Sequence, residues 1–255
     1  MRTARLWPWF LILCSFPLDA AAQQDGDKVV VKSQTALLRS LEDTTGSVTE
    51  GAVLVVKNVD GDWFWVIWSN GYQTAKGWIN RADVIPYSQA LDFFNQELKR
   101  NPTAAVYNNR GMIWNEKGEQ ENAIADYSEA IRLDPKDASA FYNRGQAWSE
   151  EQEYGKAIAD YSEAIRLDPK DMHAYKHRGG AWKATGQFDK AIADYDKAIR
   201  LNPKYAMAYL SRGNVWWAKK EYRKAISDYD EAIRLGLRSF GAEGGRSLTL
   251  RKRLS

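Results

Sequence analysis

Small and aromatic residues in residues 104–238 fall at spacings typical of paired amphipathic helices. Tyr107, Gly111 and Trp114 occur at i, i+4 and i+7. This spacing places the three residues on one stripe of an α-helix. A second stripe of alanine, tyrosine and isoleucine follows in residues 123–133. The pattern therefore predicts two helices that pack against each other through these stripes.

The pair of stripes occurs four times, at an interval of 34 residues. Because one helix pair cannot bury its apolar face alone, a fixed period of this size predicts stacked units in a helical solenoid. Proline after the second stripe ends the second helix of the first three units. The repeated positions are Gly111, Gly145, Gly179 and Gly213; Trp114, Trp148, Trp182 and Trp216; Tyr127, Tyr161, Tyr195 and Tyr229; and Pro135, Pro169 and Pro203.

The combined pattern, aromatic-x2-Arg-Gly-x2-Trp and then Ala-x3-Tyr-x2-Ala-x4-Pro, closely resembles the tetratricopeptide repeat. The resemblance covers four repeats in residues 103–237 and implies an all-α solenoid. It also implies a concave groove, lined by the first helices, that binds a protein or peptide. Leu237 replaces the proline of the fourth unit, so that unit is atypical, as terminal repeats tend to be.

An arginine and an aspartate depart from the family pattern in every unit. The family usually has leucine before the glycine, whereas this chain has arginine there. A recurring, partly buried guanidinium needs a recurring anionic partner. We therefore expect one structural Arg–Asp pair across each helix hairpin, formed by Arg110, Arg144, Arg178 and Arg212 with Asp126, Asp160, Asp194 and Asp228.

Residues 27–87 have a different pattern, in which short segments of alternating apolar and polar residues are separated by turn signals. Asn70-Gly71 between two such runs is a strong β-hairpin signal. These features predict an all-β small barrel, and the segments at residues 36–39, 61–66 and 77–79 resemble a bacterial Src-homology-3-like domain. The resemblance places Trp63 at the ligand-stacking position, whereas Asn80 and Asp83 replace the groove proline and tyrosine. Two hypotheses stay open, a packing or spacer domain and a domain that binds cell-envelope material.

Residues 88–102 are expected to form a connecting helix that caps the first repeat. Ala90, Phe94 and Pro102 follow the pattern of the second half of a repeat. No Gly/Ser-rich linker separates this helix from the barrel, so we expect the two domains to be held in a fixed relation.

The family resemblance also identifies residues that line the groove. Their side chains change from amide through basic to apolar along the array, which predicts an extended peptide with an acidic part and a hydrophobic anchor at Trp217. The alternative is that Trp217 only covers the exposed end of the array. The candidates are Asn108, Met112 and Asn115; Tyr142, Gln146 and Ser149; His173, Lys176 and Lys183; and Leu210, Asn214 and Trp217.

Candidate catalytic and metal-binding residues are scarce. His173 and His177, the two histidines, are four residues apart on one helix, but the sequence shows no third ligand. Cys14 is the single cysteine. We therefore expect no enzyme activity, no metal and no cofactor.

Residues 1–22 resemble a secretory signal, with Arg2 and Arg5 before an apolar run and an Ala20-Ala21-Ala22 cleavage site. We expect an exported protein, periplasmic or secreted, without a membrane span. The net charge of +3 does not indicate a nucleic-acid partner.

The basic tail at residues 238–255 is expected to be flexible, so the last repeat either is covered by the tail or self-associates. Together, these features predict a non-catalytic adaptor that binds a protein or peptide. The alternative is a peptidoglycan-type envelope-binding protein that acts through its barrel.

Overall fold

The computed structural model describes residues 28–32, 35–39, 44–49, 53–69, 74–237 and 244–246. The chain divides into two compact domains, Met1–Ser88 and Gln89–Ser255. The predicted signal segment, the turn at Asn70-Gly71 and most of the basic tail lie outside the described residues.

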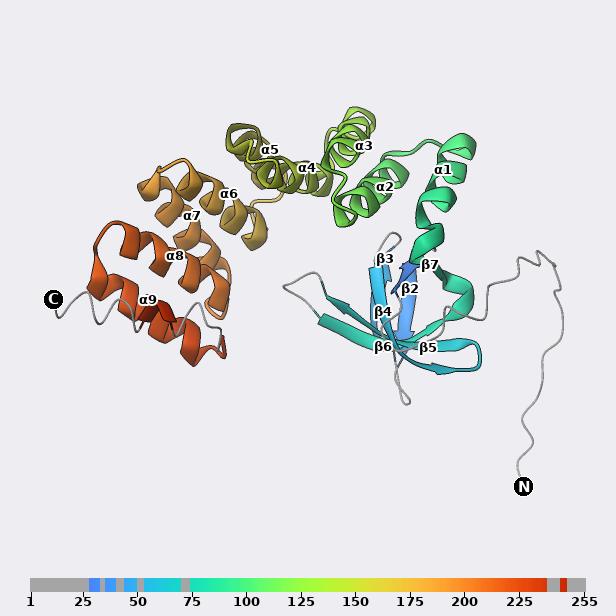
Figure 1. Cartoon of the computed structure of the whole chain (residues 1–255), viewed down its shortest axis with the longest axis horizontal. Helices are drawn as coiled ribbons and strands as arrows, with labels where there is room; N and C mark the ends of the chain where they lie inside the picture. The colour runs from blue at the N-terminus through green and yellow to red at the C-terminus, as the bar shows by residue number, and fades with distance from the viewer. Residues whose placement is uncertain are drawn as a thin grey trace, which may run out of the picture. The chain divides into compact units, whose positions relative to one another are not determined.

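The first domain contains a seven-stranded antiparallel sheet with the strand order β3-β2-β6-β5-β4-β1-β7 (Figure 1). Alternate residues of the central strands, such as Leu54 and Val56 or Phe64 and Val66, are buried in one apolar cluster. This alternation follows from the two-residue period of a strand. The strands are β1 (Lys28–Val31), β2 (Thr35–Arg39), β3 (Thr44–Thr49), β4 (Val53–Asp60), β5 (Trp63–Ser69), β6 (Thr74–Asn80) and β7 (Val84–Pro86), with 3₁₀ turns at Arg81–Asp83 and Tyr87–Gln89.

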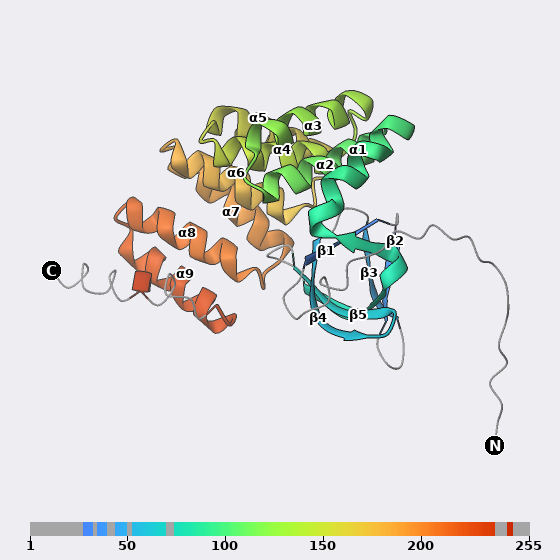
Figure 2. The same ribbon diagram turned by 45° about the vertical axis from the view of Figure 1, so that its right-hand side comes forward.

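The expectation of a closed barrel is wrong, because this is a small open sheet. Its edge strands are β3 and β7, and no ladder joins them in the described strands. The short β7 ends at Pro86, which has no backbone N–H to donate to a further strand. The strands β4 and β5 are curved in Figure 2, and a register shift lies between Val56 and Asn58. Alternating strands with tight turns predict a sheet, but closure depends on edge pairing that the pattern does not encode.

The second domain is a helical solenoid of four successive helix pairs preceded by one helix (Figures 1 and 2). Each pair is called a unit here, from unit 1 (α2 and α3) to unit 4 (α8 and α9). This arrangement confirms the predicted helix pairs. The helices are α1 (Ala90–Arg100), α2 (Ala104–Glu116), α3 (Gln120–Leu133), α4 (Ala138–Glu150), α5 (Tyr154–Leu167), α6 (Met172–Ala184), α7 (Phe188–Leu201), α8 (Ala206–Ala218) and α9 (Tyr222–Arg234).

Each unit is closed by contact between a glycine of the first helix and a tyrosine of the second. The Tyr127 ring is buried against Gly111, where an added Cβ would lie only 2.7 Å from its Cε1 atom. The other units repeat this contact at Gly145, Gly179 and Gly213. Glycine is therefore required at these positions because the aromatic ring occupies the space of a side chain.

Local signals also define where the helices begin and where their pairs turn. The side chains of Thr103, Asp137 and Asp171 accept hydrogen bonds from backbone N–H groups at the starts of α2, α4 and α6. In the turn inside each unit, one residue has a positive φ between 60° and 79°. Unit 1 and unit 3 have glycine there, which adopts this backbone readily. These residues are Gly118, Gln152, Gly186 and Lys220.

Described residues pack on the array at both of its ends. At the start, α1 buries Ala90 and Phe94, as the second helix of a unit would. At the end, residues 244–246 form a helical turn. An added Cβ on Gly245 would lie 3.0 Å from the Tyr229 ring of α9, and Arg246 forms an ion pair with Asp230. These three tail residues thus contact the last unit, while coverage by the whole tail and self-association stay predictions.

Candidate functional site

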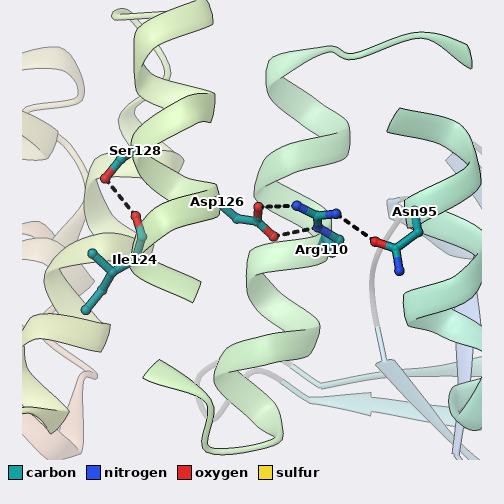
Figure 3. Close-up of polar contacts among 5 residues, drawn as sticks. All are labelled: Asn95, Arg110, Ile124, Asp126 and Ser128. Carbon is teal, nitrogen blue, oxygen red and sulfur yellow. Dashed lines mark hydrogen bonds and ion pairs between the residues drawn. The ribbon is translucent and has the colours of Figure 1, made fainter. Parts of the chain in front are cut away.

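The arginine of every unit forms the expected ion pair with the aspartate of the second helix. In unit 1, Nε and Nη2 of Arg110 donate to the two carboxylate oxygens of Asp126 at 2.8 and 2.6 Å (Figure 3). Units 2, 3 and 4 repeat this two-pronged geometry. The four aspartates are buried. The predicted intra-unit pairs are therefore confirmed.

The remaining guanidinium nitrogen joins each unit to the preceding helix pair. Nη1 of Arg110 donates to Asn95 of α1 at 2.7 Å, as Figure 3 shows. The equivalent acceptors for the next three arginines are Ser128, Ser162 and Asp196. Burial raises the pKa of Asp228 in unit 4, opposed by its bond to Arg212. We call these bonds within and between units the arginine ladder. The ladder satisfies buried charges inside the array and is structural.

The first helices form the inner side of the solenoid. Each first helix contacts the first helix of the next unit directly, from α2 to α8, and more extensively than successive second helices contact each other. The array therefore curves with the first helices inside. Their exposed side chains line a concave face.

A cavity of about 340 Å³ opens where units 2, 3 and 4 meet on this face. Lys176, Gly180 and Lys183 line it from α6, at the i, i+4 and i+7 positions of one stripe. The remaining lining residues are Ser149, His177, Ala184, Tyr195, Ser211 and Asn214. The cavity thus combines two lysines with hydroxyl and amide groups.

A second cavity of about 330 Å³ lies beside the first and shares Lys183 and Asn214 with it. Its other lining residues are Trp217, Ala218, Tyr229 and Gly245. The Asn214 side-chain oxygen accepts a hydrogen bond from the Tyr229 hydroxyl at 2.9 Å. Nε1 of Trp217 is buried and has no hydrogen-bond acceptor in the described part of the chain. This second cavity is more apolar than the first.

The ionisable groups around the first cavity are perturbed mainly by burial. Burial lowers the pKa of the Lys176 ammonium. Burial, together with the charge of Lys176, also lowers the pKa of His177 to about 3, so this ring is neutral at neutral pH. The positive charge of the cavity therefore comes from its lysines.

The two histidines contact different units. The His177 ring packs on Tyr142 and Tyr161, with centroid distances of 5.6 and 5.9 Å. Nδ1 of His173 instead lies 3.1 Å from the Tyr205 hydroxyl at the start of α8. No group of three potential metal ligands occurs in the described residues.

The other predicted groove residues lie apart from the two cavities. Asn108 is buried and accepts a hydrogen bond from Asn143 at 3.0 Å, which joins units 1 and 2. Met112 packs on the Ala123–Tyr127 cluster, while Gln146 is partly exposed. Tyr142 packs on His177 and belongs to the interior clusters of unit 2.

In the first domain, Trp63 is half-buried at the start of β5 and is paired in register with Asn80. The Asn80 side chain caps the following 3₁₀ turn by accepting from Ala82 N–H at 2.8 Å. The carbonyl oxygen of Asp83 accepts from Lys32 N–H at 2.9 Å. Asn80 and Asp83 thus have structural roles in the sheet.

The structure brings together five of the predicted groove residues, which are Ser149, Lys176, Lys183, Asn214 and Trp217. It adds Gly180 and Ser211, which the sequence analysis missed. The signal for Gly180 was present, because only unit 3 has two consecutive glycines at Gly179-Gly180. The second glycine removes the side chain that each other unit has there.

The helix pairs, their period and their packing define a solenoid of tetratricopeptide repeats. Two family models support this class. One, described as TPR repeat, matches residues 111–150 and 181–220, and the other, described as Tetratricopeptide repeat, matches residues 138–171. The second domain of the chain thus contains tetratricopeptide repeats.

Similar solved structures include two crystal structures of MamA. One is 26% identical, with a TM-score of 0.56, and the match covers 61% of this chain and 90% of that one. The other is 27% identical, with a TM-score of 0.55, and covers 58% and 82%. MamA from Desulfovibrio magneticus RS-1 shares the fold at 19% identity, with a TM-score of 0.56 and coverage of 60% and 88%.

No curated protein sequence matches the chain significantly. Within the described residues, none of the helices combines the length and the apolar character that crossing a membrane requires.

Proposed function

We propose that this protein is a non-catalytic adaptor that binds a protein or peptide on the inner face of units 3 and 4. The observation that carries the proposal is the pair of adjoining cavities there, which share Lys183 and Asn214. Together they offer positive charge, hydrogen-bonding groups and an apolar wall within one continuous surface. An extended peptide has all three complementary kinds of group.

The position of Trp217 supports a binding role in addition to coverage of the last unit. Its ring borders the second cavity, beside Lys183 and Asn214. An apolar side chain of a bound peptide would cover this ring and remove its apolar surface from water.

The test is a crosslinking pull-down that compares the protein with a Lys176→Glu, Trp217→Ala double variant. Partners of the groove are expected to be captured by the protein and lost from the double variant. Lys170→Glu is the charge-matched control, because Lys170 is exposed in a turn away from both cavities. Partners retained by all three forms would contradict a groove-bound partner.

We further propose that the adaptor is exported, on the basis of the sequence of residues 1–22 alone. N-terminal sequencing of protein recovered from the producing cells measures this directly. Processing near Gln23 is expected, whereas a protein that retains Met1 or Arg2 in the cytoplasm would refute export.

A further inference from the structure

Unit 3 has no side chain at a position where each other unit has one. This position lies two residues after the recurring first-helix arginine, directly before a buried residue of the interior. It is occupied in chain order by Met112, Gln146, Gly180 and Asn214, of which Gly180 and Asn214 line the first cavity. The first cavity therefore opens where unit 3 has hydrogen in place of a side chain.

Packing does not require glycine at this position. An added Cβ on Gly180 would meet only the Tyr195 hydroxyl, at 3.9 Å, which is ordinary contact. At the neighbouring Gly179 the same atom would lie 2.9 Å from Cε1 of the Tyr195 ring. Glycine also weakens a helix interior relative to alanine. Gly180 thus costs stability and leaves open space.

The first cavity is lined by two lysines of α6. Lys176 and Lys183 lie four residues before and three residues after Gly180, and Ser149, Ser211 and Asn214 line the cavity from the neighbouring units. A carboxylate is the ligand group that charge-assisted hydrogen bonds from these lysines would favour.

The adjoining cavity adds a second requirement on the ligand. It shares Lys183 and Asn214 with the first, so one short segment can reach both. Its wall is formed by Trp217, Ala218 and the Tyr229 ring, which suit an aliphatic or aromatic side chain. The two cavities therefore select for an acidic residue close to an apolar one.

We propose that the cavity at Gly180 binds an Asp or Glu side chain of a partner peptide and that the cavity at Trp217 binds an apolar residue next to it. This inference rests on the proposed groove function and specifies its ligand class. Gly180 leaves room for the acidic side chain, Lys176 and Lys183 attract it by charge, and Trp217 makes the apolar contact.

The experiment selects binders from a phage-displayed library of random heptapeptides on the purified full chain. Enriched peptides are expected to carry Asp or Glu within one or two residues of an aliphatic or aromatic residue. Affinity of a synthesised peptide is expected to fall about tenfold or more when its acid is changed to the amide. This arm needs no change in the protein.

The matched protein variant is Gly180→Gln, which introduces the side chain that unit 2 has at Gln146. It fills the opening, retains both lysines and favours the helix, so it is expected to lower affinity about tenfold with a thermal midpoint that is unchanged or higher. Lys183→Gln is expected to have a similar effect, and Lys170→Gln none. In the Gly180→Gln variant, changing the peptide acid to its amide is expected to have little further effect.

Three results would overturn the inference, and they differ in what they leave standing. Enriched peptides that lack acids but lose binding in Trp217→Ala would refute the acid site and retain the groove function. No enrichment would refute both, as would peptides that bind Gly180→Gln and Trp217→Ala as tightly as they bind the unchanged protein.

Discussion

Gly179 and Gly180 are adjacent in α6, yet they lie in two regions of the solenoid with different constraints. Gly179 belongs to the interior, where the Tyr195 ring leaves no room for a Cβ. Gly180 belongs to the inner face, where its missing side chain opens a cavity. The interior position is glycine in all four units, whereas the inner-face position differs in each.

This difference separates folding from recognition. Interior residues recur at 34 residues because every unit must fit the next one through the same packing and the same Arg–Asp pair. Inner-face residues are not needed for that fit, so they can vary to suit a partner. The following variants test the separation, from the largest expected effect to the smallest.

Removing the anionic partner inside unit 3 is expected to have the largest effect. Asp194→Ala leaves the Arg178 guanidinium without its carboxylate, although that side chain is only 20% exposed. The expected loss in the free energy of unfolding is about 3 kcal/mol or more, measured by chemical denaturation followed by circular dichroism.

The matched control for this pair is the solvent-exposed ion pair between Glu163 and Arg166 on α5. Glu163→Ala is expected to leave the denaturation midpoint nearly unchanged. An Arg178→Leu, Asp194→Leu double variant is expected to regain part of the loss, because no buried charge is left alone. Equal midpoints for Asp194→Ala and Glu163→Ala would contradict a structural role for the ladder.

Alanine at each of the two neighbouring glycines compares the regions directly. Gly179→Ala is expected to cost up to about 3 kcal/mol, since its Cβ overlaps the Tyr195 ring. Gly180→Ala is expected to be neutral or to stabilise by up to about 1 kcal/mol, because alanine favours a helix. Thermal unfolding of both variants measures this difference, and equal destabilisation would break the distinction between interior and inner face.

The interior was predictable from the sequence because each of its constraints leaves a periodic mark. Glycine, tyrosine, arginine and aspartate at one period predicted both the helix pairs and the Arg–Asp contacts. The cross-unit bonds were missed because their acceptors change along the array, from Asn95 through Ser128 and Ser162 to Asp196. An acceptor whose residue type changes from unit to unit does not produce a periodic signal in the sequence.

The inner face and the sheet were less predictable for related reasons. The groove positions followed from the family resemblance, but Asn108 turned out to be buried in a bond to Asn143. Gly180 was missed because an opening is the absence of a side chain. In the first domain, alternating residues predicted strands, whereas the open edge at β7 depends on non-local pairing.

His177 lies at the boundary between the two regions, because it lines the first cavity and packs on the interior Tyr161 ring. A change in its protonation is therefore expected to change the free energy of unfolding. Its pKa is about 3 in the folded chain and has an ordinary value of 6.5, so the unfolded chain takes up a proton first as pH falls. Stability from this group is present above about pH 6.5 and is lost as pH falls toward 3. Between pH 7 and pH 5 the expected loss is about 2 kcal/mol.

The control for this pH dependence is His177→Asn, which introduces the residue that unit 2 has at Asn143. The variant retains a polar side chain but cannot gain a proton in this range. Most of the decrease in the free energy of unfolding between pH 7 and pH 5 is therefore expected to disappear. His173→Asn is expected to remove less of it, because burial shifts the pKa of His173 in the same direction but less far. A slope that persists in His177→Asn would assign the pH dependence to other groups.

The smallest effect is expected at a contact that is periodic but exposed. Nζ of Lys190 lies 4.3 Å from the centre of the Trp182 ring, and Lys156 and Lys224 repeat this geometry on Trp148 and Trp216. Unit 1 has Asn122 at the equivalent position, so Lys190→Asn is the matched change. An exposed cation–π contact of this kind is worth about 0.5 kcal/mol, which is the expected decrease in the free energy of unfolding. Denaturation followed by tryptophan fluorescence measures it, with Lys170→Asn as the control; a loss as large as that of Gly179→Ala would show that this exposed contact belongs energetically to the interior.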